Sequence, residues 1–450
     1  MNRLTLPELR ELDRAHHVHP FTDHKQMHGP GTHILVEGDG CHVVDAEGNR
    51  YLDGLAGLWC VNVGYNCAAI VRAVSDQMER LPFYPSFFNS TTEPPVRLAA
   101  FLAGKAPARI NKTVFSNSGS EANETALKII RATHRQRGEP KRTKILTRTF
   151  AYHGVTIATT SMTGLPNCYE PFGLPLEGFI HVPGPYVYGS KTGLDASAYG
   201  TWCLEETARI IQREGPETIA AIFVEPVQGA GGVIVPPPGY LAELRRMARD
   251  NGFLFVADEV ITAFGRLGDW FASSLWDLDP DLITLAKGLT SGYLPMGATM
   301  MSDEIADLMH GGGYFAHGFT YTGHPSCAAA ALANLHTIES CHLVENVRDD
   351  LGPLFQKKLA SFADHPAVGE VRGVGLIGAL EVVPRGGRDA IPHGTAMGIR
   401  ASAVIRDEGA IVRGIRDLIA VAPPLVITHA EIDELFGAIE RGLDKFLAAT

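Results

Sequence analysis

The stretch Phe253–Glu259 (FLFVADE) decides the fold, because a run of apolar residues leads directly into two carboxylates. Two further segments repeat this order: Ile219–Val224 (IAAIFV) ends at Glu225-Pro226, and Asp281–Leu285 (DLITL) ends near Lys287. Continuous apolar strands that alternate with helices are typical of a parallel sheet covered on both faces. The sequence therefore predicts an α/β fold with polar groups at the carboxyl ends of buried strands.

The elements predicted on either side continue this alternation. They are a hairpin over Gly40–Leu52, helices over Ala68–Leu81, Ser120–His134 and Tyr240–Asp250, and short strands over Thr113–Phe115 and Thr143–Thr147. After about Ser326 we expect a helix, a Gly-rich strand, a helix, a closing strand pair and a final helix, over Cys327–Ile338, Val371–Val383, Gly394–Asp407, Ile411–Val421 and Thr428–Leu447. We interpret residues 60–326 as a large domain and residues 1–59 and 327–450 as a smaller domain assembled from both ends.

Composition and charge exclude several classes of protein. The chain has 450 residues, with 39 basic and 50 acidic side chains and a formal net charge of −11. Binding to nucleic acid needs clustered Lys and Arg, so an acidic chain is not expected to bind it. No segment approaches the roughly 18 apolar residues of a membrane helix. The polar start, Met1–Arg14, does not resemble a secretory signal, and seven cysteines without a CxxC pair indicate free thiols. We expect a cytoplasmic protein.

The sequence does not predict a metal site. It contains neither a paired Cys motif nor HExxH. His16, His17 and His19 cluster near the start, but we find no carboxylate or Cys partner for them at ligand spacing. A polar terminal segment is the preferred interpretation.

Three polar residues mark the strand ends, namely Glu225, Asp258 and Lys287. Asp258 follows five apolar residues, so we expect its carboxylate to be buried, and a buried carboxylate needs a cationic partner. Lys287 comes one strand–helix–strand unit later, which predicts that the two side chains are neighbours across the sheet. A solvated strand end would explain Lys287 equally well if it stood alone.

A possible phosphate site lies in Ser116–Asn123 (SNSGSEAN), where a strand runs into a helix. Ser118 and Glu121 fit a capping box. The amides of Gly119 and Ser120, together with the helix dipole, suit an anion such as a phosphate, although simple capping explains this motif equally well by itself. A phosphate cradle, a buried Asp and a strand-end Lys together indicate pyridoxal 5′-phosphate (PLP). In that chemistry the Lys bonds to the aldehyde and the Asp keeps the ring nitrogen protonated.

Two other motifs are excluded by their context. Gly373–Gly378 (GVGLIG) matches GxGxxG, but it leads into the strand-like Ala379–Pro384 and opens no helix, so a dinucleotide site is not predicted. Phe255–Glu259 looks like a Walker B strand, yet the chain contains no GxxxxGK[ST], so a P-loop ATPase is excluded.

Motifs along nearly the whole chain resemble the class III aminotransferases of PLP fold type I. They are Ser116–Asn123, Tyr152-His153-Gly154, Val224–Gly229 (VEPVQG), Ala257–Val260 (ADEV), Leu285–Gly288 (LAKG) and His317–Tyr321 (HGFTY). This resemblance implies a large domain with a mostly parallel seven-stranded sheet and a smaller α+β domain built from both termini. It also implies a catalytic role for Lys287, which bonds to the cofactor and carries a proton between the substrate Cα and the cofactor C4′.

The same resemblance assigns the other cofactor contacts. Asp258 pairs with the pyridine nitrogen, while Tyr152 and Val260 cover the two faces of the ring. Gly119 and Ser120 hold the phosphate, and Thr320 reaches the phosphate of the partner chain's cofactor. Glu225 completes the expected cofactor-binding set. The active site is therefore expected at the interface of a homodimer, and a tetramer stays possible.

Additional motifs of this chain resemble one subgroup of the family, the (S)-selective amine or omega-amino-acid:pyruvate aminotransferases. The similar motifs are Leu58–Tyr65 (LWCVNVGY), Leu81–Tyr84 (LPFY) with Phe87-Phe88, and Gly229–Gly232 (GAGG). This similarity implies transfer of an amino group from a primary amine or omega-amino acid to pyruvate, giving L-alanine and an aldehyde or ketone. The residues expected to bind substrate are Phe21, Leu58, Trp59, Phe87, Phe88, Ala230 and Arg413. Arg416 lies close enough to Arg413 that the sequence does not decide which one binds the substrate carboxylate.

Two departures from the wider family concern the amino acceptor. Glutamate-using members commonly carry Glu after the QG pair and Gln three residues after the Asp, where this chain has Ala230 and Ile261. Both changes disfavour 2-oxoglutarate, and Ile261 leaves the hydrogen bond to the cofactor ring oxygen without an assigned donor. The alternatives are a 2-oxoglutarate-using aminotransferase, a PLP aminomutase or decarboxylase, and a catalytically silent PLP-fold binding protein. The sequence does not identify the amine donor.

Overall fold

The computed structural model describes residues 4–27, 31–188, 190, 192–384, 387 and 396–449. Its largest sheet has seven strands in the spatial order β4-β10-β9-β8-β7-β5-β6. Their bounds are β4 Ile110–Ser116, β10 Gly297–Ser302, β9 Leu282–Leu285, β8 Leu254–Asp258, β7 Ile219–Val224, β5 Lys144–Arg148 and β6 Phe179–Val182. Only β10 pairs antiparallel with its neighbours within this sheet. The predicted α/β fold with a mostly parallel seven-stranded sheet is confirmed.

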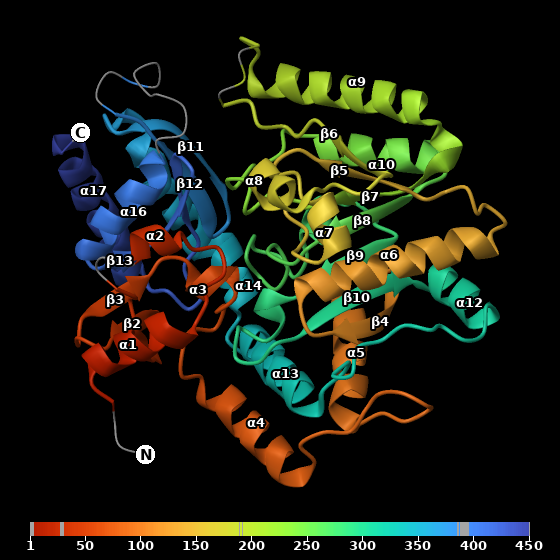
Figure 1. Cartoon of the computed structure of the whole chain (residues 1–450), viewed down its shortest axis with the longest axis horizontal. Helices are drawn as coiled ribbons and strands as arrows, with labels where there is room; N and C mark the ends of the chain where they lie inside the picture. The colour runs from red at the N-terminus through yellow and green to blue at the C-terminus, as the bar shows by residue number, and fades with distance from the viewer. Residues whose placement is uncertain are drawn as a thin grey trace.

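Helices cover both faces of this sheet (Figure 1). On one face lie α9 (Ala196–Glu214) and α10 (Tyr240–Asp250), and on the other lie α6 (Gly119–Gln136) and α12 (Asp303–Gly311). Each helix turns an apolar stripe inward; α10, for example, buries Leu241, Leu244 and Ala248. Strands buried on both faces can be apolar throughout, which explains why β7 contains no polar residue.

The two ends of the chain lie side by side and share a sheet (Figure 1). Strands β2 (His42–Asp45) and β3 (Arg50–Asp53) form the predicted hairpin. The strand before it, β1 (Leu35–Asp39), was not predicted; it pairs antiparallel with β2, and β13 (Ala410–Ile411) pairs parallel with β3. A second sheet has the order β11-β12-β15-β14. Its strands are β11 Val368–Val374, β12 Ile377–Val382, β15 Leu418–Val421 and β14 Arg413–Ile415. The helices α16 (Met397–Asp407) and α17 (His429–Ala448) pack against each other beside these strands. No helix in the described ranges is long and apolar enough to cross a membrane.

The predicted single strand over Val371–Val383 is wrong. The segment forms two antiparallel strands, β11 (Val368–Val374) and β12 (Ile377–Val382), and the GxGxxG motif lies at the turn between them. Gly375 in this turn has φ +56°, and a Cβ there would lie 2.6 Å from the Arg266 carbonyl oxygen, so a side chain is excluded. The turn was not predicted because apolar and glycine residues continue through it without a polar residue. The predicted start of the next helix at Gly394 lies outside the described residues, and α16 begins at Met397.

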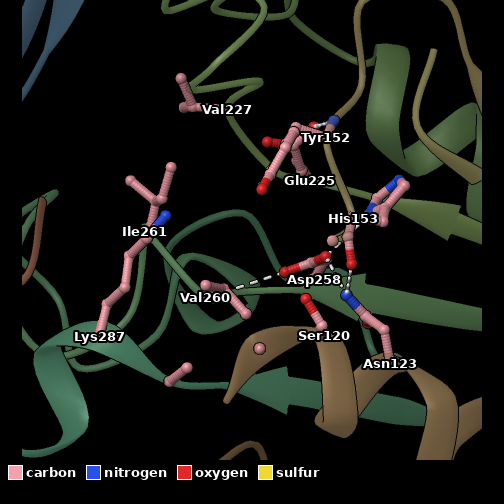
Figure 2. A pocket seen from close by; sticks show the side chains of 13 residues that line it. Ser120, Asn123, Tyr152, His153, Glu225, Val227, Asp258, Val260, Ile261 and Lys287 are labelled. Atoms are coloured by element: carbon pink, nitrogen blue, oxygen red, sulfur yellow. Dashed lines mark hydrogen bonds and ion pairs between the residues drawn. The ribbon is translucent and has the colours of Figure 1, made fainter. Parts of the chain in front are cut away.

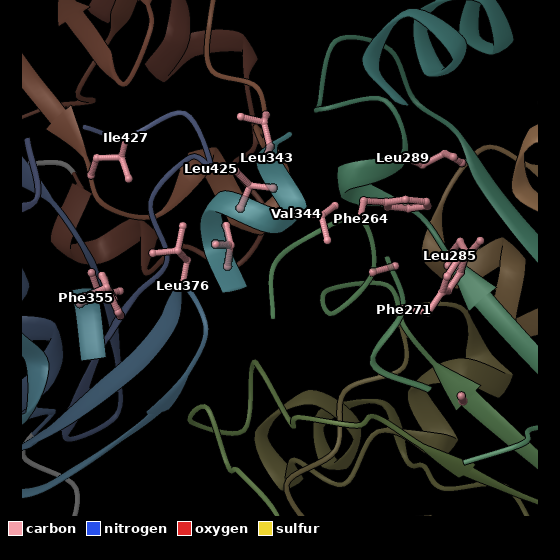
Figure 3. Packing of buried hydrophobic residues seen from close by; sticks show 14 of the residues in the cluster. Phe264, Phe271, Leu285, Leu289, Leu343, Val344, Phe355, Leu376, Leu425 and Ile427 are labelled. Carbon is pink, nitrogen blue, oxygen red and sulfur yellow. The ribbon is translucent and has the colours of Figure 1, made fainter. Parts of the chain in front are cut away.

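A single hydrophobic cluster joins the large sheet to the C-terminal part (Figure 3). It includes Phe264, Phe271 and Leu285 from the sheet side, and Leu343, Leu376 and Leu425 from the C-terminal side. The fully buried Arg266 crosses the same junction and donates to the Leu376 carbonyl at 3.1 Å and to Asn62 Oδ1 at 3.1 Å. This junction fixes the C-terminal part against the edge at which β8 and β9 end.

Candidate active site

A cavity of about 160 Å³ opens at the carboxyl ends of β7, β8 and β9 (Figure 2). The strand register sets Asp258 opposite Thr284, three residues before Lys287, so the ends of β8 and β9 meet at this edge. Seven of the residues predicted to bind the cofactor line the cavity: Gly119, Ser120, Tyr152, Glu225, Asp258, Val260 and Lys287. The structure therefore brings together groups from five separate segments of the chain.

Asp258 is buried at the floor of the cavity and is held by three donors. Its Oδ2 atom accepts from His153 Nδ1 at 2.7 Å and from Asn123 Nδ2 at 2.8 Å, while Oδ1 accepts from the Val260 amide at 3.2 Å. Each carboxylate oxygen can accept about two hydrogen bonds, so Oδ1 retains capacity for a further donor. The carboxylate is thus fixed in place with one oxygen available toward the cavity.

Glu225 fixes the loop that carries Tyr152. Its Oε1 atom accepts from the Tyr152 amide at 3.0 Å, and Oε2 accepts from the Gly229 amide at 3.1 Å. Burial raises the pKa of the Glu225 carboxyl, and the nearby Asp258 carboxylate raises it further, while His153 opposes the shift. Glu225 therefore acts on the backbone around the cavity, joining the segment before Tyr152 to the loop that follows β7.

The N-terminus of α6 closes the opposite end of the cavity. Ser118 caps the helix and accepts from the Glu121 amide at 3.2 Å, as predicted. The predicted return bond, from the Ser118 amide to the Glu121 carboxylate, is wrong. That carboxylate instead accepts from the amide of Asn117, one residue earlier, at 2.7 Å. A Cβ at Gly119 would lie 3.2 Å from Val260, so glycine keeps this end open. Unpaired first-turn amides and the helix dipole make such an end suitable for a phosphate.

Lys287 follows β9 with a left-handed backbone, φ +44°. Its Nζ lies 5.5 Å from the centroid of the Trp59 ring. The turn that carries it is held by Asn334, whose Nδ2 donates to the Gly288 carbonyl at 2.8 Å and to the Leu289 carbonyl at 3.0 Å. Burial lowers the pKa of the Lys287 ammonium, against the attraction of the Asp258 carboxylate. A lowered pKa favours the neutral amine, which can act as a base.

The two candidate arginines have different surroundings. Arg413 lies with Cζ 4.8 Å from the Trp59 ring centroid, and its guanidinium has no hydrogen bond or ion pair with any residue in the described part of the chain. Arg416 instead donates to the Gly231 carbonyl at 2.7 Å and lies over the Phe150 ring. Arg416 is therefore engaged in holding the loop that contains Ala230, whereas Arg413 is available to a ligand.

The other residues predicted to bind substrate lie outside the lining of the cavity. Trp59 is buried and connects Lys287 to Arg413. Phe21 and Phe88 are 75% and 86% exposed, and Leu58 is also exposed. Phe87 packs edge-on against Phe88, with ring centroids 5.9 Å apart. Thr320, expected to serve the partner's site, is exposed in the segment before α13 (Pro325–Ser340).

Several cavity residues were not assigned a role from the sequence. His153 and Asn123 both bind Asp258, and both stand inside the quoted motifs, so their place in those motifs was the available signal. Val227 and Ile261 also line the cavity and make one wall apolar (Figure 2). Contacts between distant segments such as these follow from the fold rather than from local sequence.

A model of the family described as aminotransferase class-III matches residues 24–443. The chain belongs to the class III aminotransferases. It is 41% identical to the putrescine–pyruvate aminotransferase of Pseudomonas aeruginosa, covering 98% of this chain and 97% of that one. It is 40% identical to the mitochondrial gamma aminobutyrate transaminase 1 of Solanum lycopersicum, covering 94% and 84%.

Solved structures of aminotransferases superpose on nearly the whole chain. An (S)-enantioselective omega-transaminase from Thermomicrobium roseum has a TM-score of 0.95 at 42% identity, covering 99% of this chain and all of that one. An omega transaminase from Pseudomonas jessenii in complex with PMP has a TM-score of 0.94 at 37% identity, covering 98% of each chain. The predicted PLP fold type I is thus confirmed, and this aminotransferase is a PLP-dependent enzyme.

The cavity fits the chemistry of that cofactor. An anion-binding helix terminus lies at one end, a carboxylate with a free acceptor position lies at the floor, and a lysine of lowered pKa enters from β9. The residues that would hold PLP are Gly119 and Ser120 at the phosphate, Asp258 at the ring nitrogen, and Lys287 at the aldehyde carbon.

The expectation that no carboxylate lies at ligand spacing to the N-terminal histidines is wrong, because Asp13 precedes His17 by one helical turn. Its carboxylate lies within 4.8 Å of ring nitrogens of both His17 and His19. The helix that ends at His16, α1 (Leu6–His16), gives Asp13 and His17 this common side.

Proposed function

We propose that this aminotransferase transfers an amino group from a primary amine or omega-amino acid to pyruvate, giving L-alanine and an aldehyde or ketone. The observation that carries this proposal is the pairing of an unengaged Arg413 with an apolar wall. Ile261 lines the cavity and Ala230 lies on the adjoining loop, so these two positions add no carboxylate or amide to the single cation that Arg413 offers to a carboxylate. Pyruvate has one carboxylate and a methyl group, which matches that arrangement. Relatives named for pyruvate and for (S)-selectivity support the proposal.

Catalysis depends on what each residue does at the bound cofactor and substrate. PLP supplies an electron sink for the pair left on the substrate carbon when its proton is removed. Lys287 Nζ would take that proton from the substrate Cα and deliver it to the cofactor C4′, and burial lowers the pKa of this amine toward the range in which it acts as a base. Asp258 holds a proton on the ring nitrogen, and His153 and Asn123 keep its carboxylate oriented. Tyr152 and Val260 pack on the two faces of the ring.

The site must accept two different substrates in turn. Arg413 binds the carboxylate of pyruvate or alanine through paired N–H donors. A neutral amine offers no such group, and the Trp59 ring then faces the substrate together with Phe87 and the rim residues. An aromatic rim favours apolar or long-chain amines.

The acceptor is tested by a panel of amines assayed with pyruvate or 2-oxoglutarate. We expect stoichiometric conversion of pyruvate to L-alanine without release of carbon dioxide, and slow turnover with 2-oxoglutarate. In a matched variant, Ala230→Glu with Ile261→Gln, the ratio of kcat/KM for pyruvate to kcat/KM for 2-oxoglutarate is expected to fall. Equal kcat/KM values for the two acceptors in the parent enzyme would refute the proposal, and carbon dioxide release would indicate a decarboxylase.

We further propose that the enzyme works as a homodimer in the cytoplasm, with residues 60–326 as its large domain. The exposed aromatic side chains of Phe21 and Phe88 and the exposed Thr320 support a surface that a partner chain covers. All seven cysteines are free, which is typical of a reducing compartment. Light scattering on the holoenzyme is expected to give twice the chain mass or a multiple of it, and Thr320→Ala is expected to weaken PLP binding. A monomeric holoenzyme with unchanged PLP affinity in that variant would refute the dimeric site.

A further inference from the structure

A carboxylate and two imidazoles meet where α1 ends, and none of the three lines the active-site cavity. Asp13 Oδ1 lies 3.0 Å from His17 Nδ1 and 2.8 Å from His19 Nε2, and Asp13 Oδ2 lies 3.0 Å from the same His19 nitrogen. The two imidazole rings have centroids 4.1 Å apart. Three side chains of metal-binding type therefore converge on one point from a short piece of chain.

The local backbone produces this convergence. Asp13 and His17 are four residues apart, so they share one side of the helix. His17 is the C-cap with extended backbone angles, φ −113° and ψ 125°, and an extended backbone points residues two apart to the same side. His19 therefore turns its ring to the same carboxylate. Zinc–nitrogen bonds are about 2.0–2.1 Å, which places ligand atoms roughly 3–3.5 Å apart, close to the separations present here.

Groups around the three residues hold them in place. The Thr32 hydroxyl donates to Asp13 Oδ2, which orients the carboxylate. The His24 ring contacts the His19 carbonyl at 3.1 Å and fixes the segment after the helix. The Asp13 and His19 side chains are only 15% and 20% exposed, whereas His17 is 62% exposed. The site is thus supported from beneath and open to water on one side.

We propose that Asp13, His17 and His19 bind one divalent transition cation of the zinc type, with water completing its coordination. Two imidazoles and one carboxylate suit Zn²⁺, Co²⁺ or Ni²⁺, whereas Mg²⁺ and Ca²⁺ require oxygen ligands throughout. The bound ion ties the end of α1 to the segment that leads to Phe21, one of the residues predicted to bind substrate. The competing explanation is a set of ordinary His–Asp ion pairs, which needs no metal.

Titration of the EDTA-dialysed holoenzyme with Zn²⁺ in a non-coordinating buffer separates the two explanations. The parent is expected to bind one more equivalent per chain than a triple variant, Asp13→Asn, His17→Gln and His19→Gln. Because both proteins contain the same free cysteines, Zn²⁺ bound by thiols is equal in the two and does not contribute to the difference in stoichiometry. The matched control is His16→Gln, because His16 is exposed on the same turn and outside the cluster, and it is expected to bind as the parent does.

Two further measurements keep the test decisive if the triple variant folds poorly. Thr32→Val retains all three ligands and is expected to weaken Zn²⁺ binding by about tenfold, the usual effect of losing a group that orients a ligand. Co²⁺ in the same position is expected to give a visible spectrum without thiolate charge-transfer bands, which Asp13→Asn abolishes. Equal Zn²⁺ stoichiometry in the parent and in Asp13→Asn, or a thiolate-type Co²⁺ spectrum, would overturn the proposal.

Discussion

The floor and the rim of the active site are built differently. At the floor, Asp258 is buried and receives three hydrogen bonds, and Glu225 is buried with both oxygens bonded to backbone amides. The predicted rim consists of the residues expected to bind substrate; of these, Phe21 and Phe88 are mostly exposed and lie outside the cavity lining. The Arg413 guanidinium has no hydrogen bond or ion pair in the described ranges. The floor is therefore held by hydrogen bonds within one chain, whereas the residues of the predicted rim are less constrained.

We infer that the residues of the floor carry out the chemistry and that the residues of the predicted rim select the substrate. Buried, fully bonded groups hold a fixed geometry, which suits the proton transfers common to every substrate. Exposed rings and a free guanidinium can adapt to a carboxylate in one half-reaction and to an apolar amine in the other. Variants at the floor are thus expected to lower turnover with all substrates, and variants at the rim are expected to discriminate between them.

The largest effect is expected from Lys287→Ala. Removal of this amine eliminates both the bond to the cofactor and the base at Cα, so turnover and the visible absorbance of the lysine-bound cofactor are expected to vanish for every amine. Spectra and steady-state rates check this, with the exposed Lys141→Ala as a control that retains both. Full activity in Lys287→Ala would place the chemistry elsewhere than at this floor.

The second largest loss of activity is expected from Asp258→Asn. The substitution keeps the shape of the side chain but removes the negative charge that holds a proton on the ring nitrogen. We expect kcat to fall by about two to three orders of magnitude, the usual effect of losing a preorganised electrostatic partner, and equally for pyruvate and for the amine donor. If kcat stayed within about tenfold of the parent in both half-reactions, Asp258 would be a structural group only.

The floor was largely predictable from the sequence for a physical reason. A run of apolar residues such as Ile219–Val224 forms a strand only when both faces are covered, so its end and the next polar residue are well defined. The strand β7 and the helix α10 match their predicted bounds. The strand β8 is shifted by one residue from the predicted Phe253–Ala257, and β9 begins one residue later than predicted. Glu225, Asp258 and Lys287 were found by their place at strand ends.

Other features depend on contacts that local sequence does not specify. His153 and Asn123 come from different segments, and only the fold brings both to Asp258. The turn at Gly375 was missed because glycine and apolar residues continue through it without a polar break. Likewise, Arg413 and Arg416 stand close in sequence, and only their contacts in the fold distinguish them: Arg413 lies over the Trp59 ring, and Arg416 donates to the Gly231 carbonyl.

Arg413→Ala is expected to separate the two substrates. Its free guanidinium serves a carboxylate, and hydrogen bonds to charged groups contribute about 1.5–3 kcal/mol each. We therefore expect KM for pyruvate to rise roughly tenfold to a hundredfold, with little change in KM for a neutral amine such as 1-phenylethylamine. Initial-rate kinetics with each substrate varied in turn check this. Equal changes for both substrates would show that the rim does not discriminate by charge.

Arg416→Asn is the matched control for Arg413 and carries the smallest expected effect. Arg416 has φ +52°, a conformation that Asn tolerates, so the turn between β14 and β15 is retained. The variant loses the bond to the Gly231 carbonyl, but Arg372 still holds the adjacent Gly232 carbonyl through Nε at 2.8 Å and Nη2 at 2.6 Å. A net loss near 0.5 kcal/mol corresponds to about a two- to threefold rise in KM. Because Ala230 in this loop is predicted to contact either substrate, this rise is expected for pyruvate and amine alike. A rise confined to pyruvate would instead make Arg416 the carboxylate-binding residue and return Arg413 to the role of a packing group over Trp59.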